Sequence, residues 1–313
     1  MITMGCALCR EQRTIDHQSS DPLPPCDTHP NRAMVDWNYI KKYPEDELLG
    51  EIVNQRYVLV RPLGEGGFGS VYFAIQRGQI RRPVAIKFLT RLDDEFEELF
   101  RDEMRVMTRL RNAHVVQFLD SGSHQSFSYR RSVPYMVMEF IEGLTLADLM
   151  ITNGPLAPLK VITFLRQLLM ALVDTHEYGV IHRDLKPLNL MISHERGGGL
   201  RLVVLDFGVA RLADEVTRDA TRNKIMGTPY YLAPEVLLHG EITHQTDLFA
   251  AAVIAYEALC FRSPFLNEEL PGIEPYVRLR NIYQSGQAPN PLPDTLPSEW
   301  GLFFKCALSC DPK

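Results

Sequence analysis

One stretch of the chain reads His182-Arg183-Asp184-Leu185-Lys186-Pro187-Leu188-Asn189. It places a carboxylate, an ammonium group and an amide within six residues, directly after a helical hydrophobic pattern over residues 159–178. These three groups suit a proton acceptor, a phosphate contact and a metal ligand, respectively. Since an isolated polar loop could also be ordinary surface structure, its meaning depends on the motifs around it.

Two further motifs follow downstream. Asp206-Phe207-Gly208 comes after a short apolar strand pattern at residues 202–205, so its carboxylate stands at a strand end, where it can face a cleft. Beyond it lies Gly227-Thr228-Pro229-Tyr230-Tyr231-Leu232-Ala233-Pro234-Glu235, followed by a nearly all-apolar helical pattern over residues 247–259. Strand patterns dominate the first part of the chain and helical patterns the second.

A glycine-rich segment lies upstream, Leu63-Gly64-Glu65-Gly66-Gly67-Phe68-Gly69-Ser70-Val71, between two β-like runs. Glycines let a backbone fold closely over phosphates, although a plain hairpin would use the same residues. A dinucleotide-binding fingerprint needs a helix straight after the glycines. Residues 70–73 are β-branched and aromatic instead, which excludes that class of site.

A lysine and a glutamate accompany the glycines. Lys87 ends the apolar run Val84-Ala85-Ile86, and Glu103 falls on the apolar face of a helical pattern over residues 94–110. A carboxylate in an apolar stripe is costly unless it is paired, and Lys87 is the candidate cation. The alternative is that Lys87 is a solvated strand end and that Glu103 reaches water.

In this order, the motifs resemble those of eukaryotic-type serine/threonine protein kinases, and the lead-in over residues 47–72 looks most like bacterial members of that family. The resemblance implies an α+β, bilobal fold over residues 57–313. A small, mainly β N-lobe with one key helix and the hinge would span residues 57–141, and a larger, mainly α C-lobe residues 142–313. Lys186 and Thr228 resemble the serine/threonine rather than the tyrosine class.

The resemblance also implies roles for individual residues. The expected catalytic residues are Asp184, Lys186, Lys87 and Glu103, and those expected to bind Mg²⁺ or Mn²⁺ are Asn189 and Asp206. The residues expected to surround ATP are Leu63, Gly64, Glu65, Gly66, Gly67, Phe68, Gly69, Ser70, Val71, Ala85, Lys87, Glu139, Ile141 and Met191. Met138 would be the gatekeeper. Arg183 would respond to phosphorylation of Thr217 or Thr221, although these threonines could simply make an exposed loop polar.

Three features depart from the family pattern. Ala250 and Ala252 stand where serine and glycine are usual, and residues 197–199 form a glycine insertion expected to be a hairpin. The family arginine that pairs with the glutamate here numbered Glu235 does not occur before the last residue, Lys313, so we expect an incomplete C-lobe. The main function expected is ATP-dependent phosphorylation of protein Ser/Thr hydroxyls, with autophosphorylation. A pseudokinase or scaffold is the alternative.

The cysteines are unevenly distributed, since three of the six fall within the first 26 residues. Cys6-x-x-Cys9 and Cys26-x-x-His29 form two half-sites of the kind that hold structural Zn²⁺, with His17 as a possible substitute ligand. Free or redox-active thiols are the alternative. We therefore expect a zinc-ribbon-like segment at residues 1–34, which could dock a partner, and a linker at residues 35–56.

The composition narrows the remaining classes. The chain has 313 residues, 45% of them hydrophobic, a net charge of -6 and a pI near 5.9, as expected of globular protein, and it lacks the basic excess typical of nucleic-acid binding. The longest apolar stretch, residues 249–261, is shorter than the roughly 18 residues that a membrane span needs. The first residues contain neither a basic leader nor an apolar core, so a cytoplasmic protein is expected.

Overall fold

The structure is a computed structural model, and it describes residues 1–16, 22–66, 69–89, 101, 104–105, 107–126, 131–195, 197–207, 229–266 and 275–310. The chain divides into two compact units. Residues 1–104 and 117–140 form the first unit, and residues 105–116 and 141–313 form the second. Each unit is described by itself.

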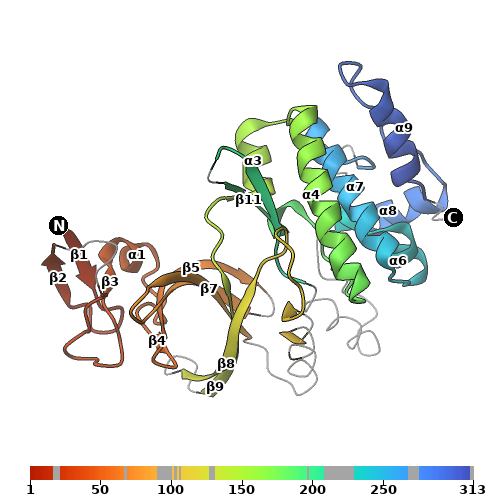
Figure 1. The fold of residues 1–313 in the computed structure, drawn as a ribbon. Helices are drawn as coiled ribbons and strands as arrows, with labels where there is room; N and C mark the ends of the chain where they lie inside the picture. Colours follow the sequence, from red (N-terminus) through yellow and green to blue (C-terminus); the bar gives the residue numbers. More distant parts are fainter. Residues whose placement is uncertain are drawn as a thin grey trace. The chain divides into compact units, whose positions relative to one another are not determined.

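The first unit is built on an antiparallel sheet, here called the large sheet, whose described strands run in the order β4-β5-β6-β7-β9-β8. The strands are β4 (Ile52–Val53), β5 (Tyr57–Gly66), β6 (Gly69–Gln76), β7 (Arg82–Leu89), β8 (Phe118–Ser126) and β9 (Arg131–Glu139). They form because apolar residues alternate along them, and Leu59, Ala74 and Val137 are fully buried. The sheet is strongly curved (Figure 1). The strands predicted on either side of the glycines are confirmed.

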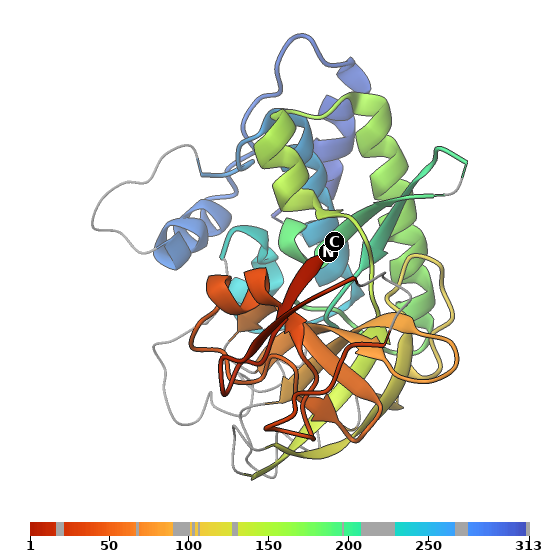
Figure 2. The ribbon, with the colours of Figure 1, turned by 90° about the vertical axis from the view of Figure 1, so that its left-hand side faces the viewer.

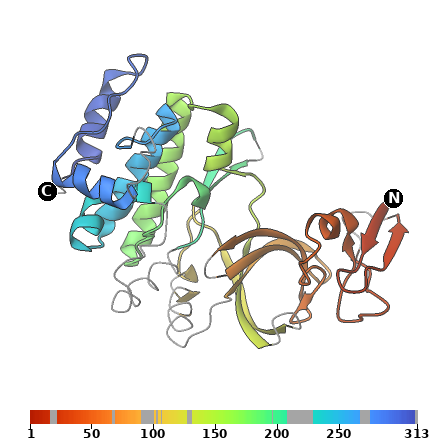
Figure 3. The same ribbon diagram turned by 180° about the vertical axis from the view of Figure 1, so that it is seen from behind.

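A second, smaller sheet lies at the start of the chain. This small sheet has the order β2-β1-β3, from β1 (Ile2–Gly5), β2 (Gln12–Ile15) and β3 (Val35–Asp36), and leads into helix α1 (Trp37–Lys42). Figures 1 and 3 show the small sheet and α1 beside the β4 and β5 part of the large sheet. Gly5 is required where β1 meets α1, because a Cβ there would overlap the ring of Trp37.

The stretch 35–56, expected as a linker, is folded into the first unit. It contains α1 and β4, and it buries Ile40, Leu49 and Val53 in the same apolar cluster as Leu59 of β5. A linker would leave such side chains in water. The sequence suggested a linker because these apolar residues are too widely spaced to form a strong local pattern.

The second unit is mainly helical. Its described helices are α3 (Leu146–Asn153), α4 (Pro158–Glu177), α6 (Pro234–His239), α7 (His244–Cys260), α8 (Pro275–Gln284) and α9 (Ser298–Ala307). Short strands β10 (Leu144–Thr145), β11 (Leu190–His194) and β12 (Leu200–Val204) form an antiparallel sheet, and 3-10 turns lie at Pro187–Asn189 and Pro229–Tyr231. Figure 2 shows the β11–β12 hairpin along α4. The helices predicted at residues 159–178 and 247–259 are confirmed.

The glycine insertion closes that hairpin, as expected. The Glu195 amide donates to the Gly199 carbonyl at 2.9 Å, and Gly197 and Gly198 have φ values of 125° and 92°. Other residues disfavour this backbone region, so the glycines allow the tight return.

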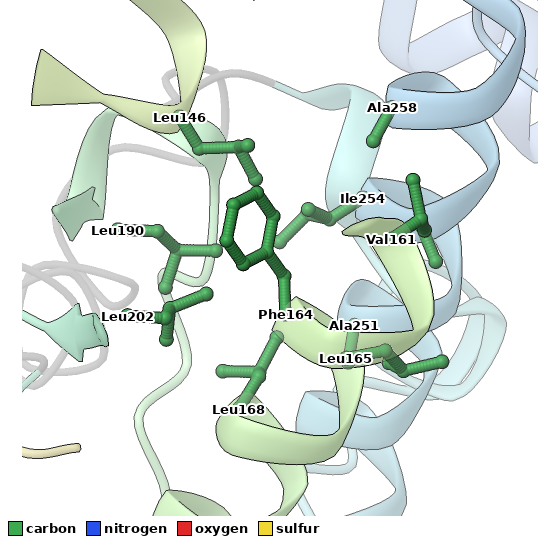
Figure 4. A pocket seen from close by; sticks show the side chains of 11 residues that line it. Leu146, Val161, Phe164, Leu165, Leu168, Leu190, Leu202, Ala251, Ile254 and Ala258 are labelled. Atoms are coloured by element: carbon green, nitrogen blue, oxygen red, sulfur yellow. The ribbon is translucent and has the colours of Figure 1, made fainter. Parts of the chain in front are cut away.

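The core of the second unit lies between α4 and α7. Figure 4 shows the ring of Phe164 on α4 between Leu146, Leu190 and Ile254, beside a small apolar cavity of about 20 Å³. α7 is buried almost all round, which explains its apolar sequence. None of the helices in the described ranges is both long and apolar enough to span a bilayer.

Candidate active site and metal centre

Asp247, in the first turn of α7, positions the loop at residues 182–189. Its carboxylate accepts hydrogen bonds from the backbone amides of His182, at 2.8 Å, and Arg183, at 2.9 Å. The same carboxylate accepts a third bond, at 2.8 Å, from Nε2 of His176 on α4. Asp247 is only 1% exposed, so three donors satisfy a buried charge and fix the loop backbone.

His182, which is fully buried, stabilises the loop by two hydrogen bonds of its ring. Its Nε2 donates to the carbonyl of Leu205 at 2.7 Å, while its Nδ1 accepts from the amide of Asp184 at 3.3 Å. These two bonds assign the neutral imidazole with its proton on Nε2. The next residue, Arg183, has a φ of 66°, a conformation that non-glycine residues rarely adopt and that concentrates at functional sites.

Asp184, Lys186 and Asn189 are brought together by this loop. Nζ of Lys186 lies 2.7 Å from Oδ2 of Asp184, and Nδ2 of Asn189 donates to the Asp184 carbonyl at 2.8 Å and to its Oδ2 at 3.3 Å. Asp184 and Lys186 keep about a fifth of their side-chain surface exposed, at 22% and 21%. A carboxylate fixed by an ammonium group and an amide, yet open to solvent, can accept a proton from an incoming hydroxyl.

Asp206 belongs to the same unit. It follows β12 and has a φ of 49°, and the amide of its neighbour Leu205 donates to the carbonyl of Asn189 at 2.8 Å. The Phe207 ring packs against the His182 ring, with centroids 4.8 Å apart. A backbone hydrogen bond thus joins the chain segments that contain Asn189 and Asp206. The side-chain oxygens of these two residues are ligands suited to a hard cation such as Mg²⁺.

The predicted nucleotide-binding residues of the first unit lie on the large sheet. Lys87 is on β7, paired with Val71 on β6 and Met136 on β9. Gly69 is required where β6 passes β7, because a Cβ there would overlap the Phe88 carbonyl, whereas Gly64 faces open space. Ala85 and Met138 are buried, and the amide of Glu139 donates to the Gln117 carbonyl at 2.9 Å.

Some predicted site residues lie in the second unit, and others lie outside the described ranges. Ile141 and Met191 belong to the second unit. The residues outside the described ranges are His17, Gly67, Phe68, Glu103, Thr217, Thr221 and Thr228.

Asp247 and His176, which together position the loop, were not predicted from the sequence. A signal was present, because Asp247 is a carboxylate at the start of a nearly all-apolar helical pattern. A carboxylate on the buried face of a helix needs hydrogen-bond donors in fixed positions. Nothing in the spacing identified those donors, since His182 lies 65 residues away in the chain.

Glu235, which was expected to lack its usual arginine partner, is hydrogen-bonded to a hydroxyl group instead. The hydroxyl of Thr246 donates to its Oε1 at 3.1 Å, and Glu235 is buried. The neighbouring Tyr231 donates to Glu257 on α7 at 2.6 Å, and burial raises the pKa of the Glu257 carboxyl. Neutral hydroxyls thus bind both carboxylates of this region.

The N-terminal cysteines converge in the first unit. The ligand atoms of Cys6, Cys9, Cys26 and His29 all lie within 4.8 Å of one another. The Sγ atoms of Cys9 and Cys26 are 3.5 Å apart, and Nδ1 of His29 lies 3.7 Å from Sγ of both Cys6 and Cys26. Tetrahedral zinc with Zn–S bonds of about 2.3 Å places its ligand atoms about 3.8 Å apart, so the four residues fit that ion.

The thiols affect each other's ionisation. Although burial opposes it, hydrogen bonds from the Glu11 backbone and from the neighbouring thiols lower the pKa of Cys9 to about 7. Burial, together with the neighbouring thiols, raises the pKa of Cys26 to about 12. The pKa values of the two thiols are thus shifted in opposite directions.

Comparison with known proteins agrees with this geometry. Residues 57–313 match the family model described as protein kinase domain. The chain belongs to the protein kinase family, and the predicted bilobal fold, with a mainly β part followed by a mainly α part, is confirmed.

The relatives are bacterial serine/threonine kinases. The chain is 33% identical over 229 residues to "Serine/threonine-protein kinase PrkC" of Bacillus subtilis, covering 72% of this chain and 34% of the relative. It is 32% identical over 270 residues to PknL of Mycobacterium tuberculosis, covering 85% and 64%, and 36% identical over 220 residues to pkn2 of Myxococcus xanthus, covering 68% and 25%. The chain thus spans less than two thirds of the length of each of these relatives.

Proposed function

We propose that the protein transfers the γ-phosphate of ATP to serine or threonine hydroxyls of protein substrates. The observation that carries this proposal is the cluster of Asp184, Lys186 and Asn189 on a loop that Asp247 holds through its backbone. Phosphoryl transfer depends on positioning and charge neutralisation more than on covalent chemistry, and a rigid polar cluster of this kind supplies both.

The reaction assigns one task to each of these side chains. Asp184 accepts the proton of the attacking hydroxyl as its oxygen bonds to the γ-phosphorus, while the bond from that phosphorus to the bridging oxygen breaks and ADP leaves. Lys186 stabilises the charge on the transferred group. Asn189 and Asp206 would hold Mg²⁺, or Mn²⁺ in its place, and a bound divalent cation neutralises phosphate charge.

The first unit would supply the phosphate-binding part of the ATP site. Lys87, oriented by Glu103, would hold the α- and β-phosphates beneath the glycines of β5 and β6, and main-chain groups of Glu139 and Ile141 would bind the adenine. Phosphorylation of Thr217 or Thr221, paired with Arg183, would switch the enzyme on. A cytoplasmic setting belongs to this proposal, since ATP is the substrate.

We also propose that Cys6, Cys9, Cys26 and His29 bind Zn²⁺. Support comes from ligand-atom separations of 3.5 to 3.7 Å, close to those of a tetrahedral site. Four protein ligands leave no open position, so the ion would be structural. Residues around it could also dock a protein partner.

Incubation with labelled ATP and Mg²⁺ tests the kinase proposal. Wild type should label itself or a generic protein substrate on serine or threonine, and the Asp184→Asn variant should reduce labelling to background. Arg77→Met, which changes an exposed residue of the first unit, serves as the matched control. Equal labelling by wild type and Asp184→Asn would refute the proposal and favour a scaffold.

A further inference from the structure

We infer that the site formed by Cys6, Cys9, Cys26 and His29 is a structural part of the kinase's first unit, so that metal bound there stabilises the large sheet. This inference rests on the proposed zinc site and goes beyond it. An appendage that only docks a partner would leave the large sheet unaffected by metal.

The backbone joins the metal loop to the large sheet in consecutive steps. The Cys26 amide donates to the Arg32 carbonyl at 3.0 Å, and the Arg32 amide donates to the His29 carbonyl at 2.9 Å. The next amide, of Ala33, donates to Gly50 at 2.8 Å, and Gly50 in turn donates to Leu59 of β5 at 2.7 Å. No more than a few residues thus separate two metal ligands from a central part of β5.

Gly50 allows this close approach. Its φ is 83°, and a Cβ at this position would overlap the Ala33 carbonyl. Only glycine combines that backbone conformation with so close an approach to the backbone of Ala33.

A buried charge network follows the same route. Nη2 of Arg32 lies 3.1 Å from Oε2 of Glu51, and Oε1 of Glu51 accepts from Nε2 of His124 on β8 at 2.9 Å. Arg32 also donates to the carbonyls of Glu47 and Leu49. The side chains of Arg32 and Glu51 are 4% and 2% exposed, so both charges depend on this geometry.

The apolar cores are continuous as well. Cys6 and Cys26 pack with Met4 and Met34 in a small buried cluster, and Leu23 packs against both this cluster and the core of the large sheet. Displacing the two ligands would therefore disturb side chains that reach the large sheet.

Together these contacts make metal binding a contribution to folding of the whole unit. The free energy of zinc binding contributes to the free energy of folding when the ligands come together only in the presence of the ion. Here the backbones of two ligands, Cys26 and His29, are hydrogen-bonded to the backbone of Arg32, and the Arg32 side chain is the buried cation beside Glu51. Loss of the ion should loosen β8, although β8 contains none of the ligands.

Hydrogen exchange of the full chain tests this. We compare wild type before and after zinc chelation, the Cys6→Ser/Cys9→Ser variant and the matched control Cys306→Ser/Cys310→Ser, with zinc content and kinase activity measured in parallel. Wild type and control should hold about one zinc ion per chain. Chelation should speed exchange in residues 118–126 about tenfold or more and leave residues 244–260 of α7 unchanged. Added zinc should reverse the change.

A second variant keeps the test decisive should the cysteine variant fail to fold. Arg32→Met should retain zinc, yet its residues 118–126 should exchange fast whether or not zinc is bound. The inference is overturned if zinc chelation of wild type speeds exchange only in residues 1–36 and leaves the exchange of residues 118–126 unchanged. Absence of zinc from wild type would refute the zinc site and this inference together. Absence of kinase activity with metal-dependent exchange in β8 would refute only the kinase proposal.

Discussion

Replacing Arg32 by Met should destabilise the first unit by about 3 to 5 kcal/mol. The change keeps most of the side-chain volume but removes the cation that lies 3.1 Å from Glu51, leaving a carboxylate that is 2% exposed. Breaking a buried ion pair from one side costs this much because the remaining charge has lost its counter-charge and cannot reach water. The carbonyls of Glu47 and Leu49 also lose a donor, which favours the upper part of the range.

Urea denaturation followed by tryptophan fluorescence measures this loss. The chain has two tryptophans, Trp37 in the first unit and Trp300 in the second, so a Trp300→Phe background leaves Trp37 as the reporter of the first unit. Arg77→Met, at an exposed position, should change stability by no more than about 0.5 kcal/mol. Glu51→Gln combined with Arg32→Met should recover part of the loss, because it removes the buried negative charge that Arg32 would neutralise and keeps an acceptor for His124. A loss below about 1 kcal/mol for Arg32→Met would show that the pair contributes no more than an exposed ion pair, contrary to this prediction.

The same network predicts a pH dependence. Burial alone would raise the pKa of Glu51, but hydrogen bonds from His124 and Ser126 and the charge of Arg32 hold that pKa below its usual value. A carboxyl with a lowered folded-state pKa contributes stability above its unfolded pKa, near 4.3, and loses it as pH falls through the folded value. The stability advantage of wild type over Glu51→Gln should therefore be complete at pH 7 and shrink below about pH 4. A constant difference from pH 7 to pH 3 would contradict this account.

Three further outcomes are expected. Asp247→Asn should lower kcat about tenfold or more with little change in the KM for ATP, because the Asp247 carboxylate holds two backbone amides of the loop at residues 182–189. An equal effect on both constants would argue for general disruption. Gly69→Ala should lower the melting temperature, because its Cβ meets a carbonyl of β7, whereas Gly64→Ala, facing open space, should change it little. Phe164→Ala should lower the free energy of unfolding by about 3 to 5 kcal/mol in denaturation experiments, because Phe164 is buried in the core. The control Leu159→Ala, at a residue 75% exposed on the same helix, should lower it by less than about 0.5 kcal/mol. Similar losses for the two variants would show that Phe164 is not a core residue.

Local patterns were sufficient to predict much of the fold. The alternation along β5 and β6 and the helical period of α4 depend on neighbours a few residues apart, and the structure confirms each of them. The cysteine half-sites were equally readable, because metal ligands occur in pairs with short spacing, and their four ligand atoms do lie together. Residues 35–56 were misread as a linker, because their buried side chains are scattered among polar ones.

The amino-acid sequence alone was enough to establish the protein kinase family, the order of β and α parts and the identity of the residues expected to carry the chemistry. The folded structure was needed to show that Asp247 holds the loop of Asp184, and that Arg32 joins the cysteine site to Glu51 and His124. The reason is physical: these polar side chains are buried, and each partner lies between 19 and 73 residues away in the chain. No short-range spacing encodes such pairs, which form only when distant segments pack and bring donors to each buried charge.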